Sequence, residues 1–281
     1  MKEKISCGFL SMFLFLLFPY LLTIFINGVD TALLNRGINV ENLLPGIVSM
    51  QISPEYEKET IKAQTVIARS NLYRKIKETD DLSEIFAMIR ESAGEPGKIW
   101  VLPESVYEEA AEETRGQVLS FEGELKLVPY HEISGGMTRN GIEVFQDEEY
   151  SYLKAVDSSI DRKSPDFLNS TYFLQQQLPA KLEIVERDSS GYVKSLLADQ
   201  NILEGEAFRQ GMGLSSSDFT IQKVGDRYRF LCKGKGHGIG FSQYGGNVLA
   251  KNGKNYAEIL NYYFPAMILD NVNDVSKYFF F

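Results

Sequence analysis

The stretch from Gly234 to Pro265 constrains the fold more than any other, because six glycines are crowded into its first half. Glycines at this density indicate backbone with positive φ, or backbone packed too tightly for a Cβ atom. The spacing excludes both nucleotide-binding loops: there is no Gly-Lys-Ser/Thr, and no further glycine completes the dinucleotide pattern. The stretch therefore presents a polar lining suited to a sugar-like ligand, made of His237, Ser242, Gln243 and Tyr244.

Each of these four side chains also has a purely structural interpretation. A lone histidine such as His237 is often a buried ring whose nitrogens are satisfied by the backbone. The hydroxyl, the amide and the phenol could bind sugar hydroxyl groups, or they could pin the loop to its surroundings. The sequence leaves both roles open.

The N-terminus has the pattern of a membrane anchor. Lys2 and Lys4 precede an apolar run over residues 5–26 that is long enough to cross a bilayer as a helix. Lysines before such a span place the N-terminus in the cytoplasm and the remainder outside. We therefore expect an uncleaved anchor at residues 1–29 and a single-pass protein of the cell membrane, with a cleaved signal peptide as the alternative.

Composition narrows the partners and the chemistry. The net charge of −9 argues against nucleic acid and against an anionic membrane surface. The two cysteines are Cys7, within the apolar run, and Cys232, so no disulfide can form within the exported part. Neither a CxxC pair nor a Cys/His zinc spacing exists, and we expect no cofactor.

Helical patterns dominate the start of the exported part. Leu44, Ile47 and Val48 have helical spacing, and Pro54 ends that helix. A second helix is predicted over residues 55–76, with glutamates in its first turns and cations toward its end, as the helix dipole favours. One stripe of this helix should be buried: Ile61, Thr65, Ala68 and Leu72.

Strand patterns follow. Residues 82–115 read as a polar insertion ending in an acidic helix, and alternation beyond Gly116 predicts a hairpin that turns at Glu122-Gly123. Two strands joined at residues 189–191, a short helix near residues 205–210 and a strand near residues 228–232 lead into the glycine-rich stretch. The last helix carries a capping box formed by Asn255 and Glu258. Residues 271–281 form a tail with no recognisable motif.

Several different motifs lie along residues 37–269. The sequence HGIGFSQYG, a helix and EILNYYFP form the last of them. An earlier one follows the pattern Leu-Lys-Ala-Gln-Ala-x-x-Ala-Arg, matched by Lys62, Ala63, Gln64, Ala68 and Arg69. A third follows His-Ser-x-Ser/Cys-Gly-Gly-x-Thr before a Tyr-Leu-x-x-Val strand, matched by His131, Ser134, Gly135, Gly136, Thr138, Tyr152 and Leu153. With these motifs the chain resembles the stage II sporulation protein D and LytB family of exported bacterial proteins that act on peptidoglycan.

The resemblance implies an α+β fold, with helices packed on twisted, mostly antiparallel sheets around a glycan-binding cleft. It also implies that Lys62 and Arg69 line this cleft beside a catalytic glutamate, across from the glycine-rich loop. From the residues alone, the two cations fit a solvated edge of the helix equally well. The other positions carried over as substrate-binding are Ser134, Gly135, Thr138, Tyr152, His237, Ser242, Gln243 and Tyr244.

An ungapped match from Gly46 through Lys62 places Gln51 where the family has its catalytic glutamate. A lytic transglycosylase uses one carboxyl group to protonate the glycosidic oxygen and then to deprotonate the C6 hydroxyl, which closes a 1,6-anhydro ring. A carboxamide can do neither, because it has no titratable proton near neutral pH. Glu41, Glu55 and Glu57 are nearby, but none of them aligns with the acid.

Some family members bind zinc at the motif that contains His131. Here Ser134 stands where a cysteine is expected, and a single imidazole does not make a zinc site. A hydrogen-bonded loop histidine is the preferred interpretation of His131, with a metal ligand as the alternative.

Two functional hypotheses follow. The first is a membrane-anchored protein of the lytic transglycosylase type that remodels septal peptidoglycan during engulfment in sporulation. The second is a pseudoenzyme that binds glycan or stimulates an amidase without cleaving. Expected partners are glycan strands, a sporulation amidase and other engulfment membrane proteins, and residues 30–270 form the exported domain.

Overall fold

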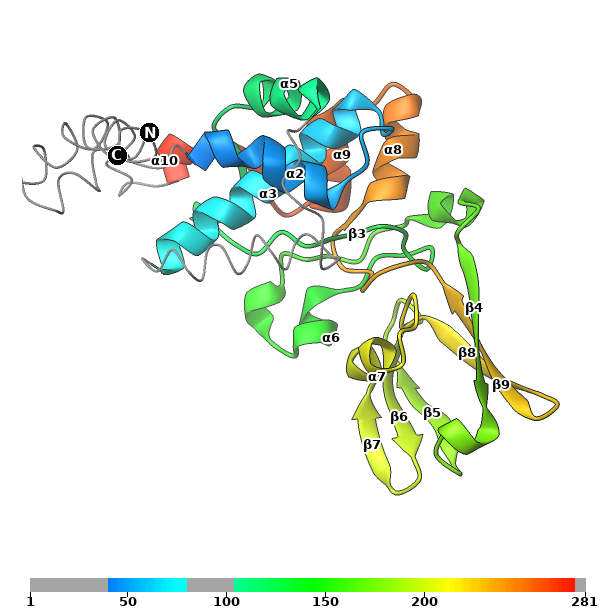
Figure 1. Ribbon diagram of the computed structural model, residues 1–281. Coiled ribbons are helices and arrows are strands. Elements are labelled where there is room, and N and C mark those ends of the chain that lie inside the picture. Colours follow the sequence, from blue (N-terminus) through cyan, green and yellow to red (C-terminus); the bar gives the residue numbers. More distant parts are fainter. Residues whose placement is uncertain (1–39, 80–103, 276–281) are drawn as a thin grey trace, which may run out of the picture. The chain divides into compact units, whose positions relative to one another are not determined.

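The computed structural model describes residues 40–79 and 104–275 (Figure 1). The predicted anchor at residues 1–29, residues 82–103 of the predicted insertion and the end of the tail lie outside this part. Among the described helices, none combines the length and apolar character needed to cross a membrane. The chain divides into a unit of Met1–Leu43 with Phe279–Phe281 and a unit of Leu44–Tyr278. Of the first, only the 3-10 turn η1 (Val40–Leu43) is described.

Two consecutive helices open the second unit, as predicted. Helix α2 (Leu44–Gln51) ends three residues before Pro54, and α3 (Lys58–Glu78) begins three residues later than the predicted start. The predicted stripe of α3 is buried throughout. Because α2, α5 (Ser105–Glu113), α8 (Gln243–Lys251) and α9 (Tyr256–Tyr263) all pack against α3, it is buried on more than one side.

The largest core forms where α3 meets the C-terminal helices. Val66 and Ile67 of α3 pack with Phe241, Tyr263 and other buried apolar residues. Strand β1 (Gln117–Phe121) borders this core and pairs antiparallel with β2 (Glu124–Leu125) and β11 (Ile268–Asn271). The β1–β2 pair confirms the predicted hairpin.

Two further antiparallel sheets enclose a second core. One has the order β4 (Leu168–Leu174), β9 (Arg227–Lys233), β8 (Phe219–Val224), and the other has the order β5 (Leu182–Arg187), β6 (Val193–Ala198), β7 (Asn201–Glu204) (Figure 1). Helix α7 (Gly205–Gly211) follows β7 and contributes Phe208 to this core. These ladders confirm a mixed helix and sheet fold with small antiparallel sheets.

The glycine-rich loop joins the two cores. It leaves β9 and enters β10 (Phe241–Ser242), which pairs in parallel with β3 (Tyr130–His131). Gly238 and Gly240 have φ values of 78° and 72°, and a Cβ atom on Gly240 would lie 2.2 Å from the carbonyl oxygen of Pro129. Both reasons for the glycine cluster, positive φ and close packing, are therefore confirmed.

The predicted capping box at α9 is also confirmed: Asn255 accepts from the backbone N–H of Glu258 and Glu258 from that of Asn255. The remaining short elements are α6 (Gly141–Phe145), η2 (Glu148–Tyr150), η3 (Ser159–Lys163), η4 (Gln175–Gln177) and α10 (Val272–Val275).

Candidate functional site

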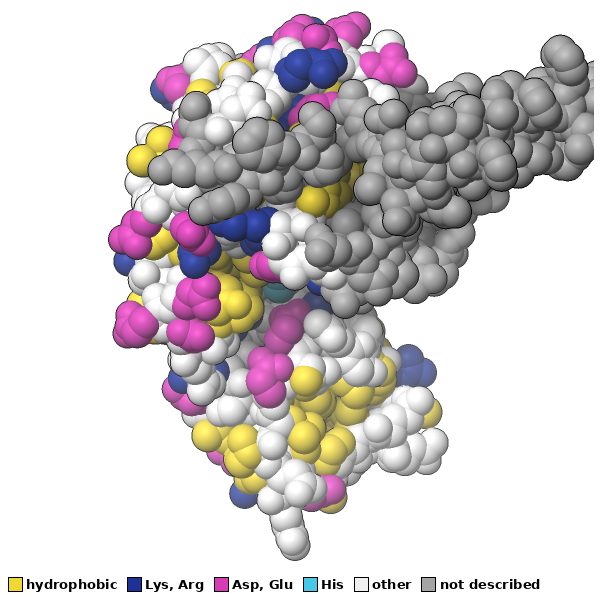
Figure 2. Space-filling model, turned by 90° about the vertical axis from the view of Figure 1, so that its left-hand side faces the viewer, with side chains coloured by type: hydrophobic (Ala, Val, Ile, Leu, Met, Phe, Trp, Pro, Cys, Tyr) yellow, Lys and Arg dark blue, Asp and Glu magenta, His cyan; other side chains and the backbone are white. Residues whose placement is uncertain are grey.

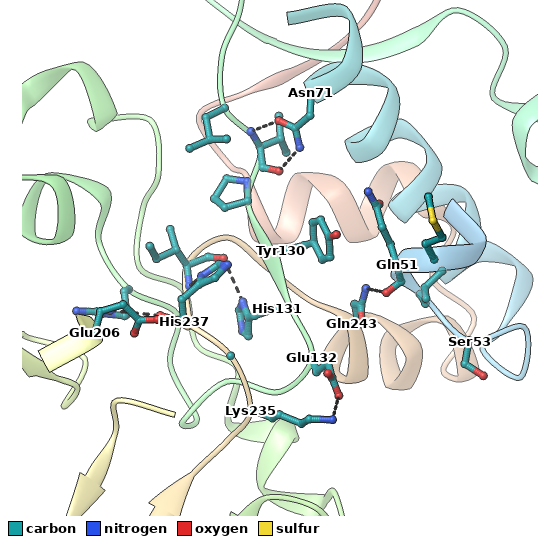
Figure 3. A pocket seen from close by; sticks show the side chains of 18 of the residues that line it. Gln51, Ser53, Asn71, Tyr130, His131, Glu132, Glu206, Lys235, His237 and Gln243 are labelled. Carbon is teal, nitrogen blue, oxygen red and sulfur yellow. Dashed lines mark hydrogen bonds and ion pairs between the residues drawn. The ribbon is translucent and has the colours of Figure 1, made fainter. Parts of the chain in front are cut away.

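A pocket of about 1270 Å³ lies where the end of α2, strand β3, the glycine-rich loop, helix α7 and the start of α8 meet. It is lined by four of the residues singled out from the sequence: Gln51, His131, His237 and Gln243. In Figure 3 the two glutamines lie at one end of the pocket and the two histidines at the other. Figure 2 shows a histidine side chain at the bottom of a hollow, with acidic side chains beside it. Residues far apart in the sequence are thus brought to one site.

Three glutamine side chains are linked at the first end of the pocket. Gln51 is the last residue of α2, Gln64 is fully buried in α3, and Gln243 is the first residue of α8. Nε2 of Gln64 donates to Oε1 of Gln51 at 2.8 Å, and Nε2 of Gln243 donates to Oε1 of Gln64 at 3.1 Å. The Nε2 atom of Gln243 also donates to the backbone carbonyl of Gln51 at 2.9 Å. Residue 51 is therefore held by two helices, through its side chain by α3 and through its backbone carbonyl by α8.

The two histidines form an edge-to-face pair with ring centroids 5.8 Å apart. Nδ1 of His131 lies 3.1 Å from the carbonyl oxygen of Ile239, while Nδ1 of His237 accepts from the N–H of Ile239 at 3.1 Å. Burial lowers the pKa of His131 to about 3 and that of His237 to about 4. Both rings are therefore neutral at neutral pH and face the pocket as polar, uncharged groups.

The low pKa of His131 predicts a loss of stability in mild acid. The ordinary pKa of histidine is 6.5, and the side chain of His131 is buried. Below about pH 6 the unfolded chain therefore binds a proton at this residue, whereas the folded chain does not. As pH falls from about 6 toward 4, this residue should lower the free energy of unfolding by about 1.4 kcal/mol per pH unit. Denaturant unfolding at several pH values measures how the free energy of unfolding changes with pH. In His131→Asn this slope should be smaller by the amount that corresponds to the uptake of one proton. An unchanged slope would contradict a neutral, buried His131.

Two carboxylates line the pocket, and both are engaged by cations. Glu132 forms an ion pair with Lys235 at 2.6 Å, and Glu206 forms one with Arg209 at 2.7 Å. Glu55 and Glu57, the glutamates closest to position 51 in sequence, do not line the pocket. No carboxylate among the lining residues occupies the end of α2.

Lys62 and Arg69 do not reach this pocket. Nζ of Lys62 forms ion pairs with Glu59 at 2.6 Å and with Glu113 at 2.7 Å. Arg69 is fully buried, and its guanidinium donates to the carbonyl of Ala111 at 2.9 Å and to other groups of α5 and β1. Seven residues apart, the two cations do share one face of α3, but α5 covers that face.

A buried carboxylate that the sequence did not signal holds the two glycine motifs together. Oδ2 of Asp161 accepts from the N–H of Ser134 at 2.7 Å and from the hydroxyl of Ser242 at 2.8 Å. It also accepts from the hydroxyl of Ser158 at 3.0 Å. Ser134 and Ser242, expected as sugar ligands, are thus both engaged with Asp161, and neither lines the pocket.

The other predicted ligands also have internal partners. The N–H of Gly135 donates to the hydroxyl of Tyr192, and Oγ1 of Thr138 accepts from the N–H of Val156. Tyr152 is a core residue whose hydroxyl donates to the carbonyl of Leu127, and Tyr244 donates its backbone N–H to the carbonyl of Glu132. The structure places none of the four among the residues that line the pocket: Gly135, Thr138, Tyr152 and Tyr244.

Arg139 is a pocket residue without any sequence signal. Its Nε atom donates to Asp188 at 2.6 Å in an ion pair that is almost fully buried. Its Nη1 atom donates to the carbonyl of His237 at 3.3 Å, and its guanidinium lies 4.9 Å from the ring centroid of Tyr192. Arg139 therefore fixes the backbone that presents His237.

One ring nitrogen of His131 has no partner among the described residues. Its Nδ1 atom is engaged by Ile239, whereas its buried Nε2 atom has no hydrogen-bond partner among the described residues. The hydroxyl of Ser134 accepts from the N–H of Gly136. Across residues 40–79 and 104–275, no three histidine, cysteine, aspartate or glutamate side chains gather as a ligand set.

Comparisons with known proteins identify relatives along most of the chain. A family model described as stage II sporulation protein (SpoIID) matches residues 30–121. Stage II sporulation protein D of Bacillus subtilis (strain 168) is 28% identical over 257 residues, covering 82% of this chain and 74% of that protein. The protein of the same name from Bacillus amyloliquefaciens is 26% identical, covering 86% and 78%. An amidase enhancer of Bacillus subtilis (strain 168) is 24% identical, covering 80% of this chain and 40% of the enhancer.

Proposed function

Because the chain belongs to the stage II sporulation protein D and LytB family, we propose that its pocket binds peptidoglycan glycan strands without cleaving them. The observation that carries this proposal is the position of Gln51. It lines the pocket at the end of α2, where the family motif has a glutamate, and the neighbouring glutamines hold it there. A binding site without its acid is the function that this geometry supports best.

The chemistry of the pocket agrees with binding rather than cleavage. A carboxamide has the length of a glutamate side chain and forms hydrogen bonds, but it carries no proton that it can transfer near neutral pH. The neutral histidines and the amides offer donors and acceptors of the kind that sugar hydroxyl and acetamido groups use. The lining carboxylates Glu132 and Glu206 are each neutralised by an adjacent cation.

The names of the relatives and the N-terminal sequence support a setting for this activity. We place the domain outside the cell membrane, anchored through residues 1–29, in the peptidoglycan that is remodelled during sporulation. The glycan strands are its proposed ligand in that setting.

A second function is supported by one relative, which is named amidase enhancer. A protein that binds glycan without cutting it can stimulate an amidase by holding the strand or the enzyme in place. Glycan binding and amidase stimulation are compatible, and both need the pocket but not an acid at position 51.

Incubation of the purified exported domain with sacculi and with peptide-stripped glycan tests the proposal. We expect the domain to co-sediment with glycan while mass spectrometry detects no 1,6-anhydro ends. Gln243→Ala should weaken sedimentation by about tenfold, since it removes the donor that holds both Gln51 and Gln64.

Gln222→Ala is the matched control, because Gln222 is an exposed residue of β8 outside the pocket. Anhydro products from the wild-type domain would contradict the absence of cleavage. Equal glycan binding by the wild type and Gln243→Ala would show that the pocket is not the binding site.

A further inference from the structure

The hydrogen bonds among the three glutamines, Gln51, Gln64 and Gln243, allow only one assignment of oxygen and nitrogen in each amide group. The backbone carbonyl of Gln51 can only accept, so the atom of Gln243 that lies 2.9 Å from it is the nitrogen. The same nitrogen lies 3.1 Å from the Gln64 side chain, and the atom it meets there is therefore an oxygen. Hydrogen-bond partners of this kind are what decides the orientation of an amide.

The orientation of the Gln64 amide in turn fixes the orientation of the Gln51 amide, which lines the pocket. With its oxygen toward Gln243, Gln64 turns its nitrogen toward Gln51 and donates to Oε1 at 2.8 Å. Gln51 is left with its own Nε2 group, for which no partner is found within residues 40–79 and 104–275. This nitrogen is also absent from the buried polar atoms that lack a partner in that part of the chain. Because Gln51 is half-buried and lines the pocket, its N–H₂ group faces the ligand space.

We propose that position 51 is a fixed hydrogen-bond donor, and that the pocket selects a neutral oxygen acceptor of the glycan at this point. A glycosidic ether oxygen or the carbonyl oxygen of an acetamido group has this chemistry, and neither offers a proton in return. The inference rests on the proposed function for the identity of the ligand. The direction of the donor rests only on the three hydrogen bonds.

Gln64 is the residue that sets this direction, although it does not line the pocket. An amide at position 64 can donate to Gln51 while it accepts from Gln243. A carboxylate there can only accept, so Gln51 has to turn its nitrogen inward and present its oxygen to the ligand. Gln64→Glu therefore reverses the polarity of position 51 without changing the residue there.

Calorimetric titration with a neutral N-acetylglucosamine oligosaccharide measures this reversal. For the wild type we expect constant affinity between pH 5 and 8, because burial lowers the pKa of His131 to about 3 and that of His237 to about 4, which keeps both rings neutral in this range. For Gln64→Glu we expect affinity close to wild type at pH 5, where the buried carboxyl is protonated and can donate, and about 3- to 10-fold weaker binding at pH 8. Gln51→Met, which has no amide, should be weaker by a similar factor at every pH, and Gln222→Met should be unchanged.

Side-chain amide exchange in the unliganded protein tests the direction of the donor without any glycan. The Gln51 amide protons should exchange with water much faster than those of Gln64 and Gln243, with signals assigned by their loss in Gln51→Met. Gln51 protons as protected as the other two would overturn the proposal, as would Gln51→Met binding equal to wild type. Fast exchange at Gln51 with no oligosaccharide binding by any variant would instead overturn the proposed function and leave the donor in place.

Discussion

Gln51→Glu is expected to release 1,6-anhydro sugars from peptide-stripped glycan, while the wild-type domain releases none. The substitution places a carboxyl group where the proposed match to the family motif has its acid, with almost no change in side-chain length. General acid and base catalysis contributes about 10²- to 10⁴-fold, so even the lower value separates the two proteins clearly. Mass spectrometry of the soluble products measures the difference.

The surroundings of position 51 are suited to a carboxylic acid. Nε2 of Gln64 would donate to one oxygen of the new carboxyl group, as it now donates to Oε1 of Gln51. The other oxygen then faces the pocket and is free to carry the proton. Because Gln64 is an uncharged donor and no cation is paired with position 51 among the described residues, nothing there strongly favours the ionised form.

Gln222→Glu, which adds the same charge on the exposed surface of β8, is the control and should remain inactive. Equal product from the wild type and Gln51→Glu would show that another carboxylate, such as Glu132 or Glu206, is the acid. An inactive Gln51→Glu that still binds glycan would show that the pocket has moved away from a reactive geometry, since a displacement of about 1 Å costs about 10²-fold.

Features that depend on neighbouring residues were predictable from the sequence. Helix α3, its buried stripe and the capping box of α9 follow from periodicity and from side chains three residues apart. The assignment of Gln51 to the position of the family's acid rests on a motif match without gaps and stays a prediction. The parallel pairing of β3 with β10 has no such local signal, because its two strands are more than a hundred residues apart.

The sequence did not indicate which element packs against each face of α3. The spacing of Lys62 and Arg69 correctly puts them on one side of α3, but no pattern in the acidic segment indicated that α5 would pack there. Helix α5 was predicted only as the acidic end of an insertion, yet its Glu113 forms an ion pair with Lys62. Likewise Gln64 matched a motif, but its role as the link between Gln51 and Gln243 depends on three separate helices.

Asp161 illustrates the same limit and gives the largest expected loss of stability. Two of its three hydrogen-bond donors, Ser134 and Ser242, come from segments that are distant in sequence, and no motif marks the residue itself. Asp161→Ala removes the acceptor that these three buried donors share, and each buried group left unsatisfied costs about 1–3 kcal/mol. We expect the free energy of unfolding to fall by about 3–5 kcal/mol in denaturant titrations at pH 7.

Two further variants separate the hydrogen bonds of Asp161 from its charge. Asp226→Ala removes an exposed carboxylate from the turn between β8 and β9 and should change stability by less than about 0.5 kcal/mol. Asp161→Asn keeps an oxygen acceptor for the donors and should cost less than half as much as Asp161→Ala. An Asn variant as unstable as the Ala variant would show that the negative charge, rather than the acceptor, holds the two loops.

The pH dependence of stability also separates the charge of Asp161 from its role as a hydrogen-bond acceptor. Burial raises the pKa of Asp161 above its ordinary value of 3.8, although the hydrogen bonds oppose this. The folded protein therefore binds this proton more tightly than the unfolded chain, and the contribution of Asp161 to stability falls as pH rises from about 4 through the raised pKa. Asp161→Asn lacks this loss, so its stability relative to wild type should increase with pH across that window. This sign is opposite to that of His131, and a relative stability that instead decreased with pH would mean that the buried carboxylate is stabilised in its charged form.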